Sequence, residues 1–485
     1  MERLRSIQLG LTVVPLCLAP LFFGSVDQLS VVVWVTLLSA AMLCGAILPM
    51  NTAQRRILLG FLVLCGAYAA VAVIQIMPGL AGGLEDPIWR HVSQLLPISA
   101  SSRISARAEI PTNAIGHFLL AVTSFTSGFF VGTSRRHSEV LTTAARHSIL
   151  LYAAYGLFAL ALTPGMLLWS PKLAYHGSLT ATFVNHNTAA TFIGCGLILW
   201  FCLAFQTLQS LQFRSLRELL LTSSNEHVAF KFILRSGAAF TCMFALLLTG
   251  SRGGLICSML GLLVAIGLMV AGVIRVRFWY ALVSAIAALA VVVFWLSHVG
   301  GIGSRGFFDD GRWSVYQYCV DLIRQRPLMG SGAGTFADIF PSLRGTEFNT
   351  WGVWDFAHST ILEIAVEMGI PIALAIALAA VISLLILARA ALKLGWKDRG
   401  RGSLAAIAGI ATAGYLHSII DFSLQIPGFL IVFGCLLGCG IARSVAEQVP
   451  VRQARSREFE SVRPGTDVPG LALETPPVTS RGKIP

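Results

Sequence analysis

Charged side chains are scarce in this sequence. They make up 12% of the 485 residues, whereas apolar residues make up 55%, and the mean hydropathy is +0.76. A soluble protein of this size would normally have about 25% charged residues. The composition therefore excludes an ordinary soluble globular protein and indicates a chain that lives in a membrane.

Several catalytic and metal-binding patterns are also missing. The ten cysteines include no CxxC pair and no zinc spacing, and almost all lie in apolar runs, so we interpret them as small packing residues. The sequence has no Ser-His-Asp order and no carboxylate pair of the glycosidase type. The glycine-rich stretch GSGAGTF, residues 330–336, lacks the GK[ST] ending of a phosphate-binding loop, and we predict a tight turn there.

Apolar runs of roughly 20 residues recur along the whole chain, and each is long enough to cross a hydrocarbon layer of ~30 Å. Backbone polar groups have no water partner in that layer, so the runs must be helices. The sequence predicts an all-α polytopic membrane protein with these twelve spans: 8–24, 29–49, 57–77, 112–132, 147–168, 186–207, 232–250, 254–274, 278–298, 358–388, 403–421 and 427–446. The first lacks a cleavage site and is expected to be retained. The long run 358–388 must tilt or extend beyond the bilayer.

The basic balance follows from membrane topology. The net charge is +12, but with the N-terminus inside, 25 of the 35 lysines and arginines fall on inner segments, as the positive-inside rule requires. We therefore expect membrane lipids around the chain and no nucleic-acid partner. Residues 1–446 would form one integral membrane domain, followed by a disordered inner tail, 447–485.

The largest outer loop is predicted at residues 299–357. Within it, residues 311–326 have helical periodicity, and Pro327 and Gly330 end the pattern. One face of this helix would carry Trp313, Tyr316, Val320 and Ile323.

Polar residues from five distant parts of the chain fall at the predicted outer ends of the spans. They are Asn185, His186, Asn187, Arg252, Arg305, Arg312, His358, His417 and Asp421. Polar groups at membrane depth are costly and often mark function. Each also has a structural alternative: Arg252 would snorkel to headgroups, Asn185 would cap a helix, His358 would face water beside a helix start, and His417 and Asp421 would form an i, i+4 pair.

Two or three arginines at this depth suit a multiply charged anion, because guanidinium groups grip phosphate in a bidentate manner. A nearby histidine can accept a proton near neutral pH. A lipid-linked pyrophosphate, with its anion at the membrane surface and its tail between helices, fits this set without a cofactor or metal. Asp309 and Asp310 are adjacent and have no evident third ligand, so we interpret them as a solvated loop.

The order of several motifs resembles the bacterial O-antigen ligase and O-antigen polymerase superfamily. These motifs are ATFVNHNTAATF, TGSRGG, DDGRWSVY, RPLMGSGAGTF, HSTILEIAVEMG and HSIIDFSLQIPG, and together they extend over roughly residues 150–440. The resemblance implies a GT-C type glycosyltransferase of the bacterial inner membrane. Such enzymes take a glycan from undecaprenyl pyrophosphate on the periplasmic face and pass it to an acceptor hydroxyl.

By the same resemblance, Arg252 and Arg312 would hold the pyrophosphate and His358 would be the essential histidine and general base. The acceptor would be lipid A–core for a ligase and another lipid-linked repeat unit for a polymerase. The ligase motif has Gly, Thr or Tyr where this chain has Ile372, and both activities stay open. So does a polymerase for capsule or exopolysaccharide.

Two other classes of protein are alternatives. Twelve spans also suit a transporter, but carriers usually place charges at the bilayer midplane. Here few ionisable residues interrupt the spans, and most charges lie outside them. A purely structural membrane scaffold is the remaining alternative.

Overall fold

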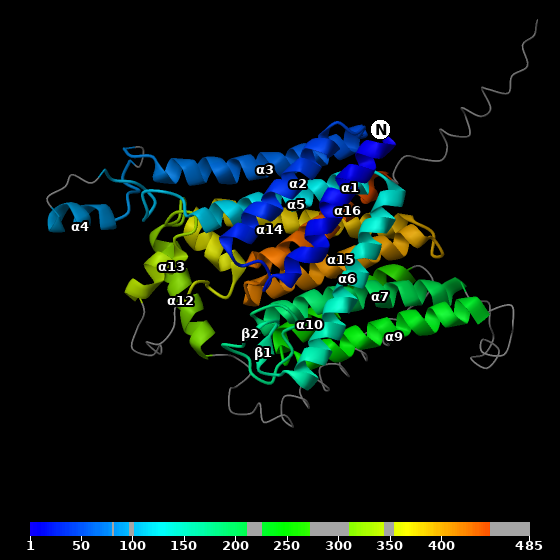
Figure 1. Cartoon of the computed structure of the whole chain (residues 1–485). Coiled ribbons are helices and arrows are strands. Elements are labelled where there is room, and N and C mark those ends of the chain that lie inside the picture. Colours follow the sequence, from blue (N-terminus) through cyan, green and yellow to red (C-terminus); the bar gives the residue numbers. More distant parts are fainter. Residues whose placement is uncertain (80–81, 97–100, 211–225, 272–309, 344–353, 447–485) are drawn as a thin grey trace, which may run out of the picture. The chain divides into compact units, whose positions relative to one another are not determined.

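The structure is a computed structural model, and it describes residues 1–79, 82–96, 101–210, 226–271, 310–343 and 354–446 (Figure 1). Helices dominate this part of the chain. The α-helices are α1 (Glu2–Leu18), α2 (Gln28–Ala46), α3 (Thr52–Ile76), α4 (Ile88–Leu95), α5 (Thr112–Gly132), α6 (Arg135–Leu162), α7 (His186–Ser210), α9 (Glu226–Leu248), α10 (Arg252–Val270), α12 (Asp310–Gln325), α13 (Phe336–Ile339), α14 (Thr360–Lys393), α15 (Arg399–Ile420) and α16 (Pro427–Ala446). Three short 3₁₀ helices are η1 (Ala19–Leu21), η4 (Phe340–Leu343) and η5 (Ser423–Gln425). A two-stranded antiparallel hairpin pairs β1 (Met166–Leu167) with β2 (Ser170–Pro171).

Eleven helices of the described residues are long and apolar enough to cross a membrane. They overlap eleven of the twelve predicted spans, so the chain is an all-α polytopic membrane protein, as the sequence predicts. The span predicted at 147–168 corresponds instead to α6, which begins twelve residues earlier and ends before β1. The remaining span, 278–298, lies outside the described residues, as do the tail 447–485 and parts of the large outer loop.

Small residues let the central helices approach closely. In α5, a Cβ atom on Gly128 would lie 2.2 Å from the backbone oxygen of Cys435 in α16, and one on Gly438 of α16 would lie 2.1 Å from the oxygen of Phe125. Helices α10 and α15 cross in the same way, since a Cβ on Gly261 would lie 2.3 Å from the oxygen of Gly409. Packing of this kind drives helix association in lipid, where the hydrophobic effect between helices is absent.

The crossing of α10 and α15 positions the polar residues at one end of both helices. A Cβ on Gly253, at the start of α10, would lie 2.9 Å from Ile420 and 3.6 Å from the ring of His417, at the end of α15. Helix α7 also begins there, since Asn187 bonds to Asp421, which follows α15. We call this end of the helices the site end.

The 34-residue helix α14 is broken at Gly369, where φ is +81°. The break accommodates the glycine-rich segment 330–336. The backbone N–H groups of Gly334 and Phe336 donate to the two carboxyl oxygens of Glu367, at 2.9 and 3.0 Å. The segment that resembles a phosphate loop thus holds an internal carboxyl group of the protein.

The helix predicted at 311–326 is present as α12, and a different face from the one singled out in the sequence is buried. Its buried side chains are Val315, Cys319 and Leu322, whereas Trp313 is 59% exposed and Val320 is 37% exposed. The sequence periodicity identifies an apolar stripe without saying what covers it. Here α12 packs against α14 and α13 through the Val315 stripe, together with Phe336, Phe340 and Val366.

Candidate active site

The carboxyl group of Asp421 is the centre of the polar cluster at the site end. Its side chain is fully buried. Oδ2 accepts a hydrogen bond from Nδ2 of Asn187 at 2.8 Å, and Nη2 of Arg312 lies 3.5 Å from the same oxygen. Burial acts to raise the pKa of Asp421, but the nearby imidazole of His358 and the charges of His417 and Arg312 outweigh it, so the pKa lies below its usual range. The group is therefore a carboxylate at neutral pH.

His358 lies beside this carboxylate and immediately before the start of α14. Its Nδ1 is 3.9 Å from Oδ2 of Asp421, beyond hydrogen-bond length, and has no hydrogen-bond partner in the described part of the chain. The ring is packed edge-on against Trp354 and Phe422, with centroids at 5.2 and 4.9 Å. The backbone at His358 has φ +54°, a left-handed conformation that costs a non-glycine residue about 1–3 kcal/mol.

Two contacts hold the backbone of His358 in that conformation. The hydroxyl of Tyr316 donates to the carbonyl oxygen of His358 at 2.8 Å. The N–H of the preceding residue, Ala357, donates to Oε2 of Glu363 at 2.7 Å, and Oε1 of Glu363 accepts from Nε2 of Gln425 at 3.0 Å. Glu363 thus ties the segment that carries His358 to the turn that follows Asp421.

The two described arginines of the predicted set belong to different helices. Arg312, in α12, donates from Nη1 to the carbonyl oxygen of Ile420 at 3.1 Å in addition to its ion pair with Asp421. Arg252 is the first residue of α10, which Ser251 caps by accepting from the N–H of Gly254 at 3.1 Å. The neighbouring Gly253 lies against His417 and Ile420, so Arg252 lies at the same site end as Arg312 and His358.

The predicted NHN triplet divides into three different roles. Asn185 caps α7, because its Oδ1 accepts from the N–H of Asn187 at 2.7 Å. Asn187 bridges two segments, since its Oδ1 accepts from Ser251 at 2.7 Å while its Nδ2 donates to Asp421. Nδ1 of His186 bonds to the carbonyl oxygen of Thr249 at 2.8 Å, and its ring stacks on Tyr175 at 4.2 Å. Asn187 and Asp421 are both buried and are bonded to each other.

His417 is also buried, and its Nδ1 lies 2.9 Å from the hydroxyl of Thr191 and 3.1 Å from that of Ser423. It supports the turn that carries Asp421 from within the helix bundle. Arg305 and Asp309, which the sequence singles out, lie outside the described residues, and Asp310 begins α12.

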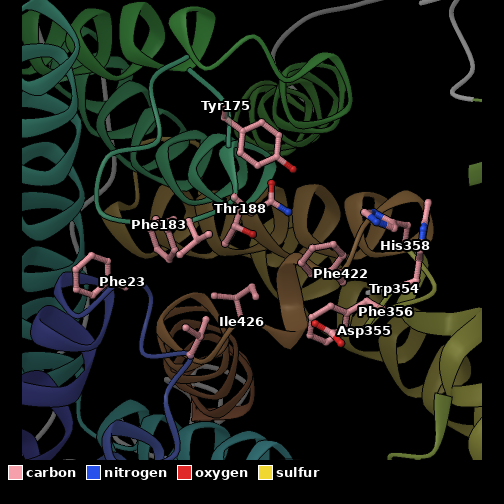
Figure 2. A pocket seen from close by; sticks show the side chains of 13 residues that line it. Phe23, Tyr175, Phe183, Thr188, Trp354, Asp355, Phe356, His358, Phe422 and Ile426 are labelled. Atoms are coloured by element: carbon pink, nitrogen blue, oxygen red, sulfur yellow. The ribbon is translucent and has the colours of Figure 1, made fainter. Parts of the chain in front are cut away.

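A cavity of about 360 Å³ opens beside His358 (Figure 2). Aromatic side chains from four separate segments surround it, and Asn185, Thr188 and His358 contribute polar groups. The lining consists of Phe23, Val26, Tyr175, Phe183, Val184, Asn185, Thr188, Trp354, Asp355, Phe356, His358, Phe422 and Ile426. Burial and the charge of Asp421 raise the pKa of Tyr175, whose hydroxyl is therefore neutral at physiological pH.

The sequence did not indicate that Glu363, Tyr316 and the aromatic residues that line the cavity belong to the site. Glu363 and Glu367 are one helical turn apart in an otherwise apolar run, and carboxyl groups at that depth are rare enough to indicate a structural or functional role. The aromatic residues had no comparable signal, because they come from parts of the chain that only the fold brings together.

Residues 237–377 match a family model described as O-Antigen ligase. This part of the chain is therefore similar to the O-antigen ligase and polymerase superfamily. The matched segment includes Arg252, Arg312 and His358, and it ends before Asp421. No curated protein matches the chain. The match supports an O-antigen ligase- or polymerase-type membrane glycosyltransferase.

Proposed function

We propose that the protein transfers a glycan from a polyprenyl pyrophosphate, undecaprenyl pyrophosphate in bacteria, to a hydroxyl group of an acceptor glycan. One observation carries the proposal: the imidazole of His358 and the guanidinium of Arg312 meet at one buried carboxylate oxygen of Asp421, beside a cavity. The proposed location is the periplasmic face of the bacterial inner membrane, which the basic inner segments of the sequence support.

In the proposed reaction, His358 is the general base. Asp421 holds the proton on Nδ1, which leaves Nε2 to accept the proton of the acceptor hydroxyl. The present separation of 3.9 Å would shorten on substrate binding, because catalytic hydrogen bonds are often long in ligand-free enzymes. The hydroxyl oxygen attacks the anomeric carbon, and the bond from that carbon to the phosphate oxygen breaks.

The leaving group is polyprenyl pyrophosphate, on which negative charge develops as the bond breaks. Arg312 and Arg252 are the proposed stabilising cations, since fixed guanidinium groups placed where charge develops lower the barrier directly. Arg252 starts a helix, and the positive end of the helix dipole adds to its effect. The acceptor is lipid A–core in a ligase and a lipid-linked repeat unit in a polymerase.

The experiment is complementation of a deletion strain with the wild-type chain, Arg252→Lys and His358→Ala. Lipopolysaccharide banding and secreted polysaccharide are measured together, and the amount of each protein in the membrane is quantified. Both variants should reach wild-type levels in the membrane and lose most of the transfer, because a lysine supplies a point charge in place of a planar fork and alanine removes the base. Normal transfer by His358→Ala at neutral pH would refute the proposed chemistry.

The same strain separates the two acceptor classes. Loss of capped lipopolysaccharide with intact free polymer would identify a ligase, and accumulation of single-repeat products would identify a polymerase.

A further inference from the structure

The cavity beside His358 combines an apolar lining with polar atoms that have no partner. Phe356 stacks on Phe422 at 4.5 Å, and Phe183 lies on the opposite side of the cavity (Figure 2). Flat, fixed aromatic faces of this kind offer an apolar surface to a ligand that carries C–H groups on one side.

Three polar atoms in the lining have no hydrogen-bond partner among the described residues: Nδ2 of Asn185, Oγ1 of Thr188 and Nδ1 of His358. The proposed reaction assigns Nδ1 of His358 to Asp421, which leaves the atoms of Asn185 and Thr188 for a ligand. Asn185 is 7% exposed and Thr188 is fully buried. Because Oδ1 of Asn185 accepts from the N–H of Asn187, the other end of the amide is fixed as the Nδ2 donor. A buried polar group without a partner costs about 1–3 kcal/mol, and such groups in a cavity usually meet a bound ligand or water.

We propose that this cavity is a sugar subsite, in which one pyranose ring packs its C–H face against the stacked pair of Phe356 and Phe422 and bonds through its hydroxyls to Thr188 and Asn185. The inference rests on the proposed function, and it names the group that is presented to His358. The volume of about 360 Å³ is within the range of small-molecule sites, about 300–1,000 Å³.

The occupant favoured by these atoms is a sugar and not the polyprenyl chain. A prenyl chain would leave the amide of Asn185 and the hydroxyl of Thr188 without partners, whereas a sugar ring satisfies both and still covers the aromatic faces. Thr188 is the decisive side chain, because the isosteric Thr188→Val replaces its hydroxyl by a methyl group. That change weakens a sugar site and leaves a prenyl site equal or better.

The first test uses the full chain in lipid nanodiscs and saturation-transfer NMR. The probes are methyl glycosides of glucose, galactose, mannose and rhamnose at millimolar concentration, with geranylgeranyl pyrophosphate as the prenyl probe. We expect ring-proton signals from at least one glycoside, and Thr188→Val should weaken its binding about two- to tenfold, the effect of one hydrogen bond. Thr188→Ser should restore it.

The matched control is Thr126→Val in α5. Thr126 is also a buried threonine without a hydroxyl partner among the described residues, but it does not line the cavity, and its variant should bind as the wild type does. The inference is overturned if no glycoside gives a signal, if Thr188→Val binds glycosides as well as the wild type, or if only the prenyl probe binds.

The second test distinguishes the donor sugar from the acceptor sugar. Transfer is measured in membranes from the deletion strain while either the lipid-linked donor or the acceptor is varied. Thr188→Val should raise the KM for the substrate whose sugar occupies the cavity by about two- to tenfold, with little change for the other. An unchanged KM for both would overturn the inference.

Failure of the subsite and failure of the proposed function give different results. If Thr188→Val has no effect while His358→Ala still abolishes transfer, only the subsite is wrong. If His358→Ala transfers normally, the proposed function is wrong, whatever the glycosides do.

Discussion

Replacing Asp421 with asparagine tests the central contact of the candidate site. The substitution keeps the shape of the side chain and removes its charge. In the wild-type protein, Oδ2 faces Nδ2 of Asn187 at 2.8 Å, Nη2 of Arg312 at 3.5 Å and Nδ1 of His358 at 3.9 Å. An amide can accept at one end only. If its NH2 group takes the place of Oδ2, Asn187 and Arg312 both face another donor, and if it takes the place of Oδ1, the N–H of Phe422 does.

The magnitude follows from the geometry. When His358 accepts a proton in the proposed step, its ring gains a positive charge 3.9 Å from Oδ2 of Asp421. In a site of effective dielectric constant near 20, that attraction is worth about 4 kcal/mol. The side chain of His358 is 20% exposed, so solvent reduces this value. We expect a loss of about 2–4 kcal/mol of transition-state stabilisation, which corresponds to a rate about 30- to 900-fold lower.

The assay is glycan transfer in membranes that contain equal amounts of each variant, with melting of the purified protein measured alongside. Asp398→Asn is the matched control, because Asp398 caps the other end of α15 through the N–H of Gly400 and asparagine caps equally well. It should keep wild-type transfer. If Asp421→Asn is folded and transfers within threefold of the wild type, the carboxylate does not orient His358 and the proposed mechanism fails.

Three further predictions follow from the same contacts. Glu363→Gln should lower kcat by about tenfold or more with little change in KM, because it loosens the segment that carries His358. Glu367→Gln, one turn along α14, should lower the melting temperature and keep kcat. Equal effects of the two variants on kcat would contradict these separate roles. Gly261→Ala should force α10 away from α15, cost about 1–3 kcal/mol and reduce transfer, whereas Gly267→Ala in the same helix meets nothing within 4 Å and should be silent in both assays. The pKa of Asp421 is lowered on folding, so its contribution to stability is full above the unfolded pKa of about 3.9 and is lost as the pH falls through the folded value. Between pH 7 and pH 3, the melting temperature should therefore fall less in Asp421→Asn than in the wild type. Identical melting curves for the two proteins would refute the ionised state of Asp421.

The fold could be predicted well because a membrane leaves few choices. Apolar runs such as 112–132 and 427–446 become helices with the predicted bounds, since the bilayer sets both their length and their secondary structure. Outside the bilayer this constraint is lost. The orientation of α12 could not be predicted, because the packing of Val315 on Phe336 and Val366 depends on contacts between distant segments.

The candidate site could be predicted only in part. The sequence places His358, Arg312 and Asp421 at one depth, and the structure brings them to a single carboxylate oxygen. The sequence pattern alone does not separate groups that would meet a ligand from groups that hold the site, and it gives no sign that Asn187 bridges Ser251 and Asp421. That distinction depends on burial and partners, which a one-dimensional pattern does not contain.

The backbone N–H groups of the glycine-rich segment bind carboxyl groups of the protein itself. In a nucleotide-binding loop, successive backbone N–H groups hold a phosphate. Here the N–H groups of Gly334 and Phe336 are bonded to Glu367, and the N–H of Ala357 is bonded to Glu363. Backbone donors around the break in α14 therefore serve internal carboxyl groups and fix the segment that carries His358. In the proposed reaction, the pyrophosphate at the site end would then be held by side-chain cations and by the positive end of α10. Among the described residues of the predicted set, these cations are Arg252 and Arg312.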